Sequence, residues 1–91
     1  MARKRVEVFY SGSVQGVGFR FTADRYASIY KISGYVKNMP DGGVKIIAEG
    51  EEESLKSFLA NITGDMRSYI RDHTEDWSPA TREFKDFGIR F

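Results

Sequence analysis

The sequence predicts an α+β domain in which two helices cover one face of an antiparallel-rich sheet. Short runs rich in β-branched and aromatic residues read as strands. Between them lie two longer runs whose apolar residues recur at helical spacing. A Pro-Asp-Gly turn joins the two middle strands into a hairpin. The resulting order is β-α-β-β-α-β with one extra C-terminal edge strand, which is a ferredoxin-like sandwich.

The first half of the chain divides into a strand, a helix and a second strand. Val6–Tyr10 has strand composition and leads into a glycine-rich loop. The next apolar residues repeat every three or four positions and predict a helix that ends before Ser33: they are Phe19, Ala23, Tyr26, Ala27 and Tyr30. Gly34–Asn38 follows as a strand, and Met39–Gly42 has the residues of a tight turn.

The second half contains the returning strand, the second helix and two further strands. Val44–Glu49 completes the hairpin, and Gly50 is expected to open the helix, which Gly64 would end. The carboxylates at 51–53 suit the start of a helix, and its core face comprises Leu55, Phe58, Leu59 and Ile62. Ser68–Trp77 is polar and predicts a charged edge strand, and Phe84–Phe91 predicts the last strand.

Composition narrows the class of protein. The 91 residues form a single domain, 1–91, with a net charge of +1 and no cysteine. Disulfides, thiolate metal sites and a cysteine nucleophile are therefore excluded. No apolar run is long enough to cross a membrane. We expect a cytoplasmic monomer that has no cofactor and binds neither nucleic acid nor membranes.

The loop Gly12–Arg20 has the residues of an anion cradle. Three glycines within it let backbone N–H groups approach a ligand, and the following helix start adds unpaired N–H donors. Arg20 adds a planar fork that matches two phosphate oxygens. The local chemistry fits a glycine-rich turn beside a surface arginine equally well.

Familiar nucleotide and metal motifs are absent from the sequence. A Walker loop would end in Gly-Lys-Ser/Thr, but Gly18 is followed by Phe19 and Arg20. The dinucleotide fingerprint would require glycine at Phe21. The single histidine, His73, lies among carboxylates on a polar strand, so we interpret it as a surface residue and expect no metal site.

Two segments resemble the signatures of the acylphosphatase family. Gly12–Arg20 is similar to the first, and Gly34–Val44, continuing to Gly50, is similar to the second. Phe87–Phe91 resembles the closing strand of the family. The likeness is weak only from about residue 63 to 76, and Lys31 stands where many members carry a helix-ending glycine.

The resemblance implies metal-free hydrolysis of carboxyl-phosphate anhydrides, which yields a carboxylate and inorganic phosphate. In that interpretation Arg20 orients the phosphoryl group and Asn38 positions the attacking water. The phosphoryl oxygens are held by backbone N–H groups of Gln15, Gly16, Val17, Gly18, Phe19 and Arg20. Asn38 also fits the simpler role of ending a strand before a turn.

The residues themselves agree with an acyl phosphate substrate, because the loop and Asn38 offer no obvious general acid. Such a site requires a leaving group that departs without a proton, and a carboxylate has a pKa of only about 4. A further hypothesis concerns the C-terminus. If the last strand lies beside the second, the Phe91 carboxylate could pair with Arg20 and hold its fork.

The sequence leaves three alternative functions open. The first is an anion-binding module without turnover, which the presence of both Arg20 and Asn38 disfavours. The second is an RNA-recognition domain, disfavoured because Val44–Glu49 carries no aromatic residue. The third is a fragment of a carbamoyl-transfer maturation protein, whose N-terminal domain is similar to acylphosphatase. The initial Met1 and the last strand favour a stand-alone enzyme.

Overall fold

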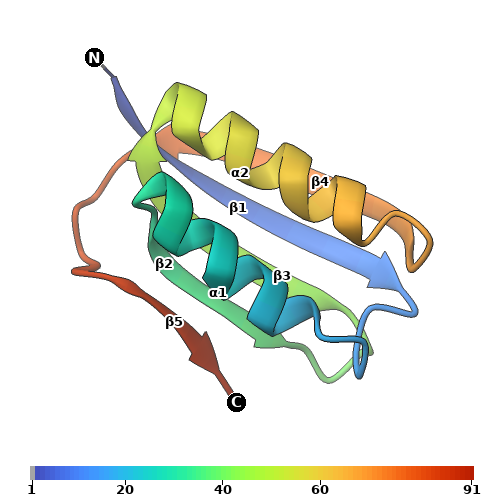
Figure 1. The fold of residues 1–91 in the computed structure, drawn as a ribbon. Coiled ribbons are helices and arrows are strands. Elements are labelled where there is room, and N and C mark those ends of the chain that lie inside the picture. The colour runs from blue at the N-terminus through green and yellow to red at the C-terminus, as the bar shows by residue number, and fades with distance from the viewer. Residues whose placement is uncertain (1) are drawn as a thin grey trace.

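A computed structural model describes residues 2–91 as two layers, a twisted sheet and a pair of helices (Figure 1). The elements run in the order β1 (Arg3–Gly12), α1 (Phe19–Tyr30), β2 (Ser33–Asn38), β3 (Val44–Glu51), α2 (Glu52–Asp65), β4 (Ile70–Pro79) and β5 (Phe87–Arg90). This order confirms the predicted ferredoxin-like α+β fold with its extra C-terminal strand.

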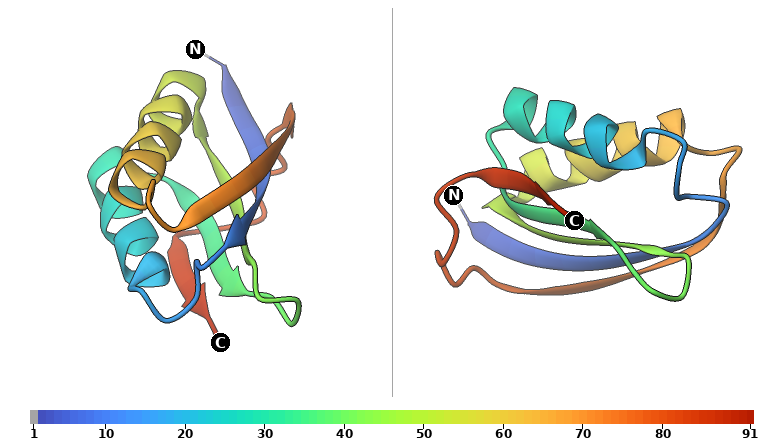
Figure 2. Two further views of the ribbon diagram at one scale, coloured as in Figure 1. Left: turned by 90° about the vertical axis from the view of Figure 1, so that its right-hand side faces the viewer. Right: turned by 90° about the horizontal axis from the view of Figure 1, so that it is seen from below.

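The sheet has the strand order β4-β1-β3-β2-β5. All neighbouring pairs are antiparallel except β2 with β5, which is parallel. The charged strand is an edge strand, as the sequence predicts, and β5 forms the opposite edge. Both helices lie on the same side of the sheet, so its other side has no helical cover (Figure 2).

The core fills the space between the helices and the sheet. Successive side chains of a strand point to opposite faces, so alternate residues such as Val6, Val8 and Val36 face the helices and are buried. The predicted apolar face of α2 is buried as well: Leu55, Phe58, Leu59 and Ile62. α1 contributes the small residues Ala23 and Ala27, which let it lie close to the sheet.

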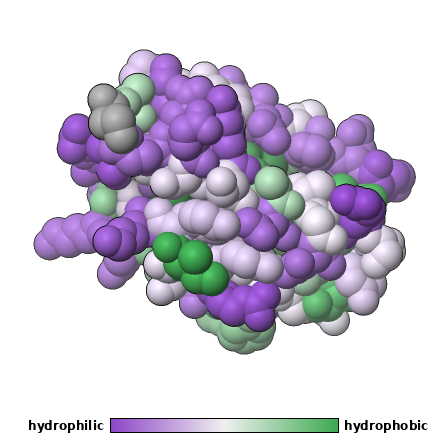
Figure 3. Space-filling model, turned by 45° about the horizontal axis from the view of Figure 1, so that its top comes forward, coloured by the Kyte–Doolittle hydropathy of each residue, from purple (hydrophilic) through white to green (hydrophobic). Residues whose placement is uncertain are grey.

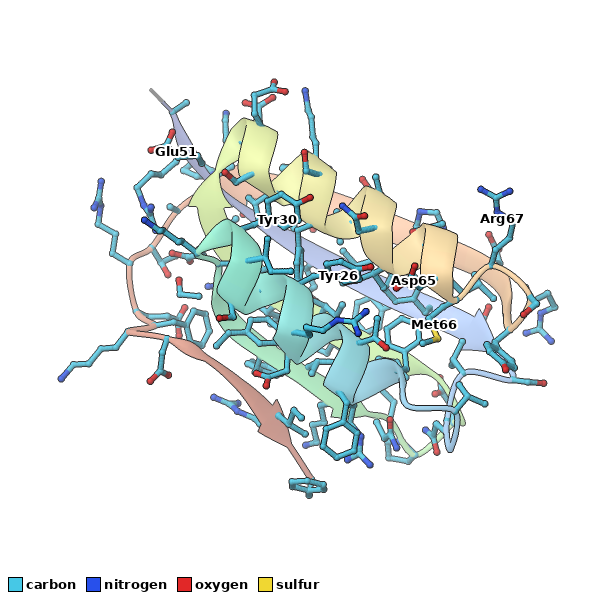
Figure 4. All side chains as sticks on the ribbon, in the orientation of Figure 1. Tyr26, Tyr30, Glu51, Asp65, Met66 and Arg67 are labelled. Atoms are coloured by element: carbon cyan, nitrogen blue, oxygen red, sulfur yellow. The ribbon has the colours of Figure 1, made fainter. Side chains whose placement is uncertain are left out.

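Polar contacts join the two helices at their surface. The hydroxyl of Tyr26 donates to Asp65 at 2.7 Å, and these two side chains point toward each other in Figure 4. Further along, the amide of Asn61 donates to the hydroxyl of Tyr30 at 2.8 Å. These bonds fix the position of α1, whose first residues border the candidate site, relative to α2.

The second helix begins later than the sequence predicts. Gly50 belongs to β3, where it pairs with Lys4, and the helix starts at Glu52. The strand backbone is buried here, and a Cβ on Gly50 would lie 2.8 Å from Ile32 Cδ1. The glycine therefore serves close packing against the chain leaving α1. Gly64 is inside α2, which ends one residue later at Asp65.

The last two strands also differ from the predicted bounds. β4 starts at Ile70 because residues 66–69 form a turn, and it extends through Pro79 opposite Lys4. Proline is tolerated there because it lies on an edge strand. β5 is confined to residues 87–90, since the chain from 80 to 86 is held away from strand pairing.

That connection is held by the carboxylate of Glu49, whose side chain is completely buried on β3. Glu49 accepts hydrogen bonds from the backbone N–H groups of Thr81 and Arg82 at 3.0 and 2.8 Å. The Thr81 hydroxyl and Arg5 Nη1 donate to it at 2.7 and 3.0 Å. Burial alone would raise the pKa of Glu49, but these bonds outweigh it and lower the pKa to about 2.

The surface over the helices is mainly hydrophilic, with only scattered hydrophobic spots (Figure 3). Neither helix within residues 2–91 is long and apolar enough to cross a membrane. Large hydrophobic side chains that are exposed are few: Phe9, Phe21, Ile29, Tyr69 and Phe91.

Acid should destabilise the fold through Glu49. A carboxyl with a depressed native pKa stabilises the fold above its unfolded pKa, and this contribution is lost as the pH falls through the native value. For Glu49 the loss runs from about pH 4.5 to about pH 2. The full contribution is about 3 kcal/mol.

The measurement is urea unfolding of the wild type and of Glu49→Gln across this pH range. The difference in the free energy of unfolding should be largest above pH 5 and shrink toward pH 2. A difference that stays constant with pH would show that the Glu49 charge is not what holds the connection.

Lys31 should carry local strain. It ends α1 in the left-handed conformation, at φ 56° and ψ 48°. A residue with a Cβ costs roughly 1 kcal/mol more there than glycine. Lys31→Gly should therefore raise the free energy of unfolding by about 1 kcal/mol, whereas Lys31→Ala, which removes the same charge, should not. Equal effects of the two substitutions in thermal denaturation would contradict the strain.

Candidate active site

The loop between β1 and α1 is shaped by two glycines. Gly16 and Gly18 have φ values of 77° and 79°, which side chains with a Cβ rarely adopt. A Cβ at either position would meet no atom within 4 Å, so the space beside the loop is open. Val14 is completely buried and anchors the loop to the core.

The N-terminus of α1 faces this open space without a cap. Gly18 precedes the helix, with no side-chain capping bond and no acidic residue in the first turn. In the described residues, the N–H groups of 15–20 have no hydrogen-bond acceptor. By contrast, α2 carries Glu52 and Glu53 in its first turn. The positive end of the α1 dipole is thus available to an external anion.

Gln15 ties the loop to the β2–β3 hairpin. Its side-chain Nε2 donates to the carbonyl oxygens of Met39 and Gly43 at 2.8 and 2.9 Å. The sequence predicts a site role for the backbone of Gln15 alone. Its side-chain role was missed because both partners lie more than twenty residues away, and nothing in the local sequence indicates them.

Arg20 is supported by the C-terminal strand. Its Cζ lies 4.6 Å from the centre of the Phe91 ring, and its Nη1 makes a long bond of 3.5 Å to the carbonyl of Arg90. The last strand does lie beside the second, since β5 pairs with β2. The contact uses a different group, however. No ion pair joins the Phe91 carboxylate to Arg20 within residues 2–91, and the aromatic face contacts the guanidinium instead.

Asn38 ends β2 and faces the same pocket as Arg20. A pocket of about 260 Å³ is lined by Val14, Gly16, Gly18, Phe19, Arg20, Phe21 and Asn38. Two residues that are 18 positions apart in sequence, Arg20 and Asn38, are thus brought together. Gln15 and Val17 belong to the loop but do not line the pocket.

Besides the buried Val14, one residue that lines the pocket is absent from the predicted site residues, namely Phe21. Its side chain is 67% exposed on the first turn of α1. The helical pattern indicates only that it lies off the core face, next to Arg20. Phe19, in contrast, is buried and packs against Tyr10, with 4.9 Å between the ring centres.

The pocket is positive and contains no acidic side chain. Arg20 is the one charged residue among those that line it. Within residues 2–91 there is no group of three or more His, Cys, Asp or Glu side chains that could hold a metal ion. His73 lies elsewhere, in a groove between α2 and β4, where Nε2 is 3.2 Å from Glu75.

Comparisons with known proteins show the family to which the chain belongs. The acylphosphatase family model matches residues 6–89. An acylphosphatase from Caldanaerobacter subterraneus subsp. tengcongensis is 38% identical over 88 residues, which are 96% of this chain and 98% of the relative. The chain belongs to the acylphosphatase family. This membership confirms the resemblance seen in the sequence, and it makes the protein a relative of hydrolases that act on small molecules.

Solved acylphosphatase structures share the whole fold. The crystal structure of acylphosphatase from Bacillus subtilis matches with a TM-score of 0.87 and 31% identity, covering 97% of this chain and 99% of that one. Full-length HypF, crystallised in a phosphate- and nucleotide-bound form, matches with a TM-score of 0.83 and 27% identity. The match covers 98% of this chain and 12% of HypF, so an acylphosphatase-like fold is also part of a much longer protein.

Proposed function

We propose that this acylphosphatase hydrolyses acyl phosphates by in-line attack of a water on a phosphoryl group held in the Arg20 pocket. One observation carries the proposal: Arg20 and Asn38 line the same pocket at the uncapped N-terminus of α1. The products would be a carboxylate and inorganic phosphate. Positioning and charge stabilisation supply most of the catalysis in reactions of this class.

The phosphoryl group would be bound from two sides. The backbone N–H groups of residues 15–20 have no acceptor in the described chain, and the space beside Gly16 and Gly18 is open. Arg20 supplies the only charge in the pocket and a fork that binds two oxygens. Gln15 keeps the loop at a fixed distance from the hairpin that carries Asn38.

Asn38 would position the water. Its amide both donates and accepts hydrogen bonds, so one water can be held and oriented toward phosphorus. A neutral amide does not repel a phosphate dianion as a carboxylate would. Because the pocket holds no acidic side chain, the leaving group must depart unprotonated. This favours carboxyl-phosphate anhydrides over alkyl phosphate esters, whose leaving groups are much more basic.

We further propose that the reaction requires no metal and that the protein acts as a cytoplasmic monomer. The single positive side chain and the backbone donors would bind the phosphoryl oxygens without a cation. The described residues offer no carboxylate or histidine at the pocket to ligate a cation.

Arg20→Gln should lower kcat/KM for acetyl phosphate by about 100-fold or more, as the loss of a transition-state donor does. The matched control is Arg25→Gln, which removes an exposed charge from the same helix and should leave the rate unchanged. Near-normal turnover by folded Arg20→Gln would refute the assignment. Absence of turnover in the wild type would instead favour an anion-binding module.

Asn38→Ala should separate water positioning from phosphate binding. It should lower kcat while the inhibition constant for inorganic phosphate stays close to that of the wild type, because only the water is lost. Arg20→Gln should weaken phosphate inhibition as well. If Asn38→Ala weakened phosphate inhibition as strongly as Arg20→Gln, the water-positioning role would be wrong.

Chelation should not affect turnover. Acetyl phosphate hydrolysis should proceed at the same rate before and after exhaustive dialysis against a chelator, and added Mg²⁺ should not increase it. Restoration of a lost rate by a divalent cation would indicate a metal mechanism.

A further inference from the structure

The face of the sheet opposite the helices carries a line of cations across three neighbouring strands. Lys37 on β2 pairs with Lys45 on β3 and with Arg90 on β5. Residues directly opposite one another project to the same face of a sheet. We refer to Lys37, Lys45 and Arg90 as the basic row. Neighbouring strands are about 5 Å apart, so the three side chains start at that spacing.

Two aromatic rings accompany the basic row. Phe9 on β1 pairs with Lys45 and continues the same line, and it is 42% exposed. Tyr35 lies two residues before Lys37 on the same strand and therefore on the same face. Lys45 Nζ lies 5.8 Å from the centre of each ring, between the two. Arg90 Cζ lies 3.8 Å from the centre of the Tyr35 ring.

The cations of the basic row have no ion-pair partner among the described residues. Like charges directly opposite each other destabilise a sheet. The protein thus keeps three adjacent positive charges that an anionic ligand would relieve.

The rest of this face limits where such a ligand can lie. At one end the β4–β5 connection covers the sheet, with Phe84 edge-on to Tyr35 at 6.0 Å and Glu49 holding Thr81. Toward β4 the face is acidic, because Glu7 pairs with Asp76. The uncovered positive track therefore runs from β5 across β2 and β3 to Phe9 on β1.

We propose that this track binds single-stranded nucleic acid. A polyanion complements the basic row, and flat rings and guanidinium planes provide the stacking surfaces that unpaired bases use on open sheets. In the sequence, the lack of an aromatic residue in Val44–Glu49 disfavours an RNA-recognition domain. The folded sheet instead brings aromatic residues from the two flanking strands to either side of Lys45. Phosphates and flat bases are common to RNA and DNA, so the two should bind alike.

The side chains of the track are separate from those of the hydrolytic pocket, although the backbone carbonyl of Arg90 contacts Arg20. Asn38 follows Lys37 along β2, so the two side chains project to opposite faces of the sheet. Neither the lysines of the basic row nor the two rings line the Arg20 pocket. Nucleic acid binding and acyl phosphate hydrolysis can therefore be tested independently.

The experiment is fluorescence anisotropy with labelled oligouridine and oligothymidine of about ten nucleotides, a length within the usual site sizes of such proteins. We expect saturable binding by the wild type, with log K falling against log salt with a slope of about −2, as three cations predict for a single strand. Lys37→Gln with Lys45→Gln should weaken binding and reduce the slope to about −0.7. Phe9→Ala should weaken binding by about tenfold through lost stacking.

Matched variants test whether position, and not charge alone, matters. Arg25→Gln with Arg67→Gln removes the same charge from outside the track, since Arg25 is on α1 and Arg67 follows α2. Tyr69→Leu removes an exposed ring before β4. Both controls should bind as the wild type does. Acetyl phosphate hydrolysis should be unchanged in Phe9→Ala and in Lys45→Gln, which also shows that these variants are folded.

Several results would overturn the proposal. These are no saturable binding at low salt, equal weakening by the helix-side controls, or unchanged binding in folded Phe9→Ala. Binding of duplex or of polyglutamate as tight as that of the single strand would show a purely ionic surface. Amide chemical shifts of the wild type titrated with oligouridine should change at residues 9, 35, 37 and 45. Changes confined to residues 15–20 would indicate phosphate binding in the pocket instead.

Discussion

The buried carboxylate of Glu49 fixes the path of the chain between the two edges of the sheet. The chain leaves β4 at one edge and must cross to the other before β5 can form. Glu49 satisfies the N–H groups of Thr81 and Arg82 during this crossing, where no strand partner is available. Because the connection is held there, β5 pairs with β2 and brings Phe91 over Arg20. The support of the candidate catalytic arginine thus depends on a carboxylate on another strand.

Local sequence patterns predicted most of the architecture because helix faces and tight turns depend on interactions between residues near one another in the chain. The core face of α2 and the Met39–Gly42 turn depend on residues a few positions apart, and the structure contains both. Gly50 was assigned wrongly for the same reason. Its sequence context resembles a helix start, but close packing against Ile32 keeps it in β3.

The sequence motifs predicted the main site residues, but not the residues that hold them in place. Arg20 and Asn38 lie in segments that resemble family signatures, and the structure places both at one pocket. Two contributions come from contacts between distant segments, namely the Gln15 side chain on the hairpin and the Phe91 ring on Arg20. Phe21 lines the pocket because it is next to Arg20 on the first turn of α1. Glu49 likewise resembles an ordinary strand end in the sequence, because its partners lie more than thirty residues away along the chain.

The short edge strand β5 should make the site more mobile than the core. β5 has only four residues, lies at a sheet edge and pairs with one neighbour. Short edge segments of this kind detach in local openings that cost far less than global unfolding. Each detachment would remove the Phe91 ring and the Arg90 carbonyl from Arg20 while the core stays closed. The guanidinium would then sample more rotamers, so the fraction of molecules with an ordered arginine follows the opening equilibrium of β5.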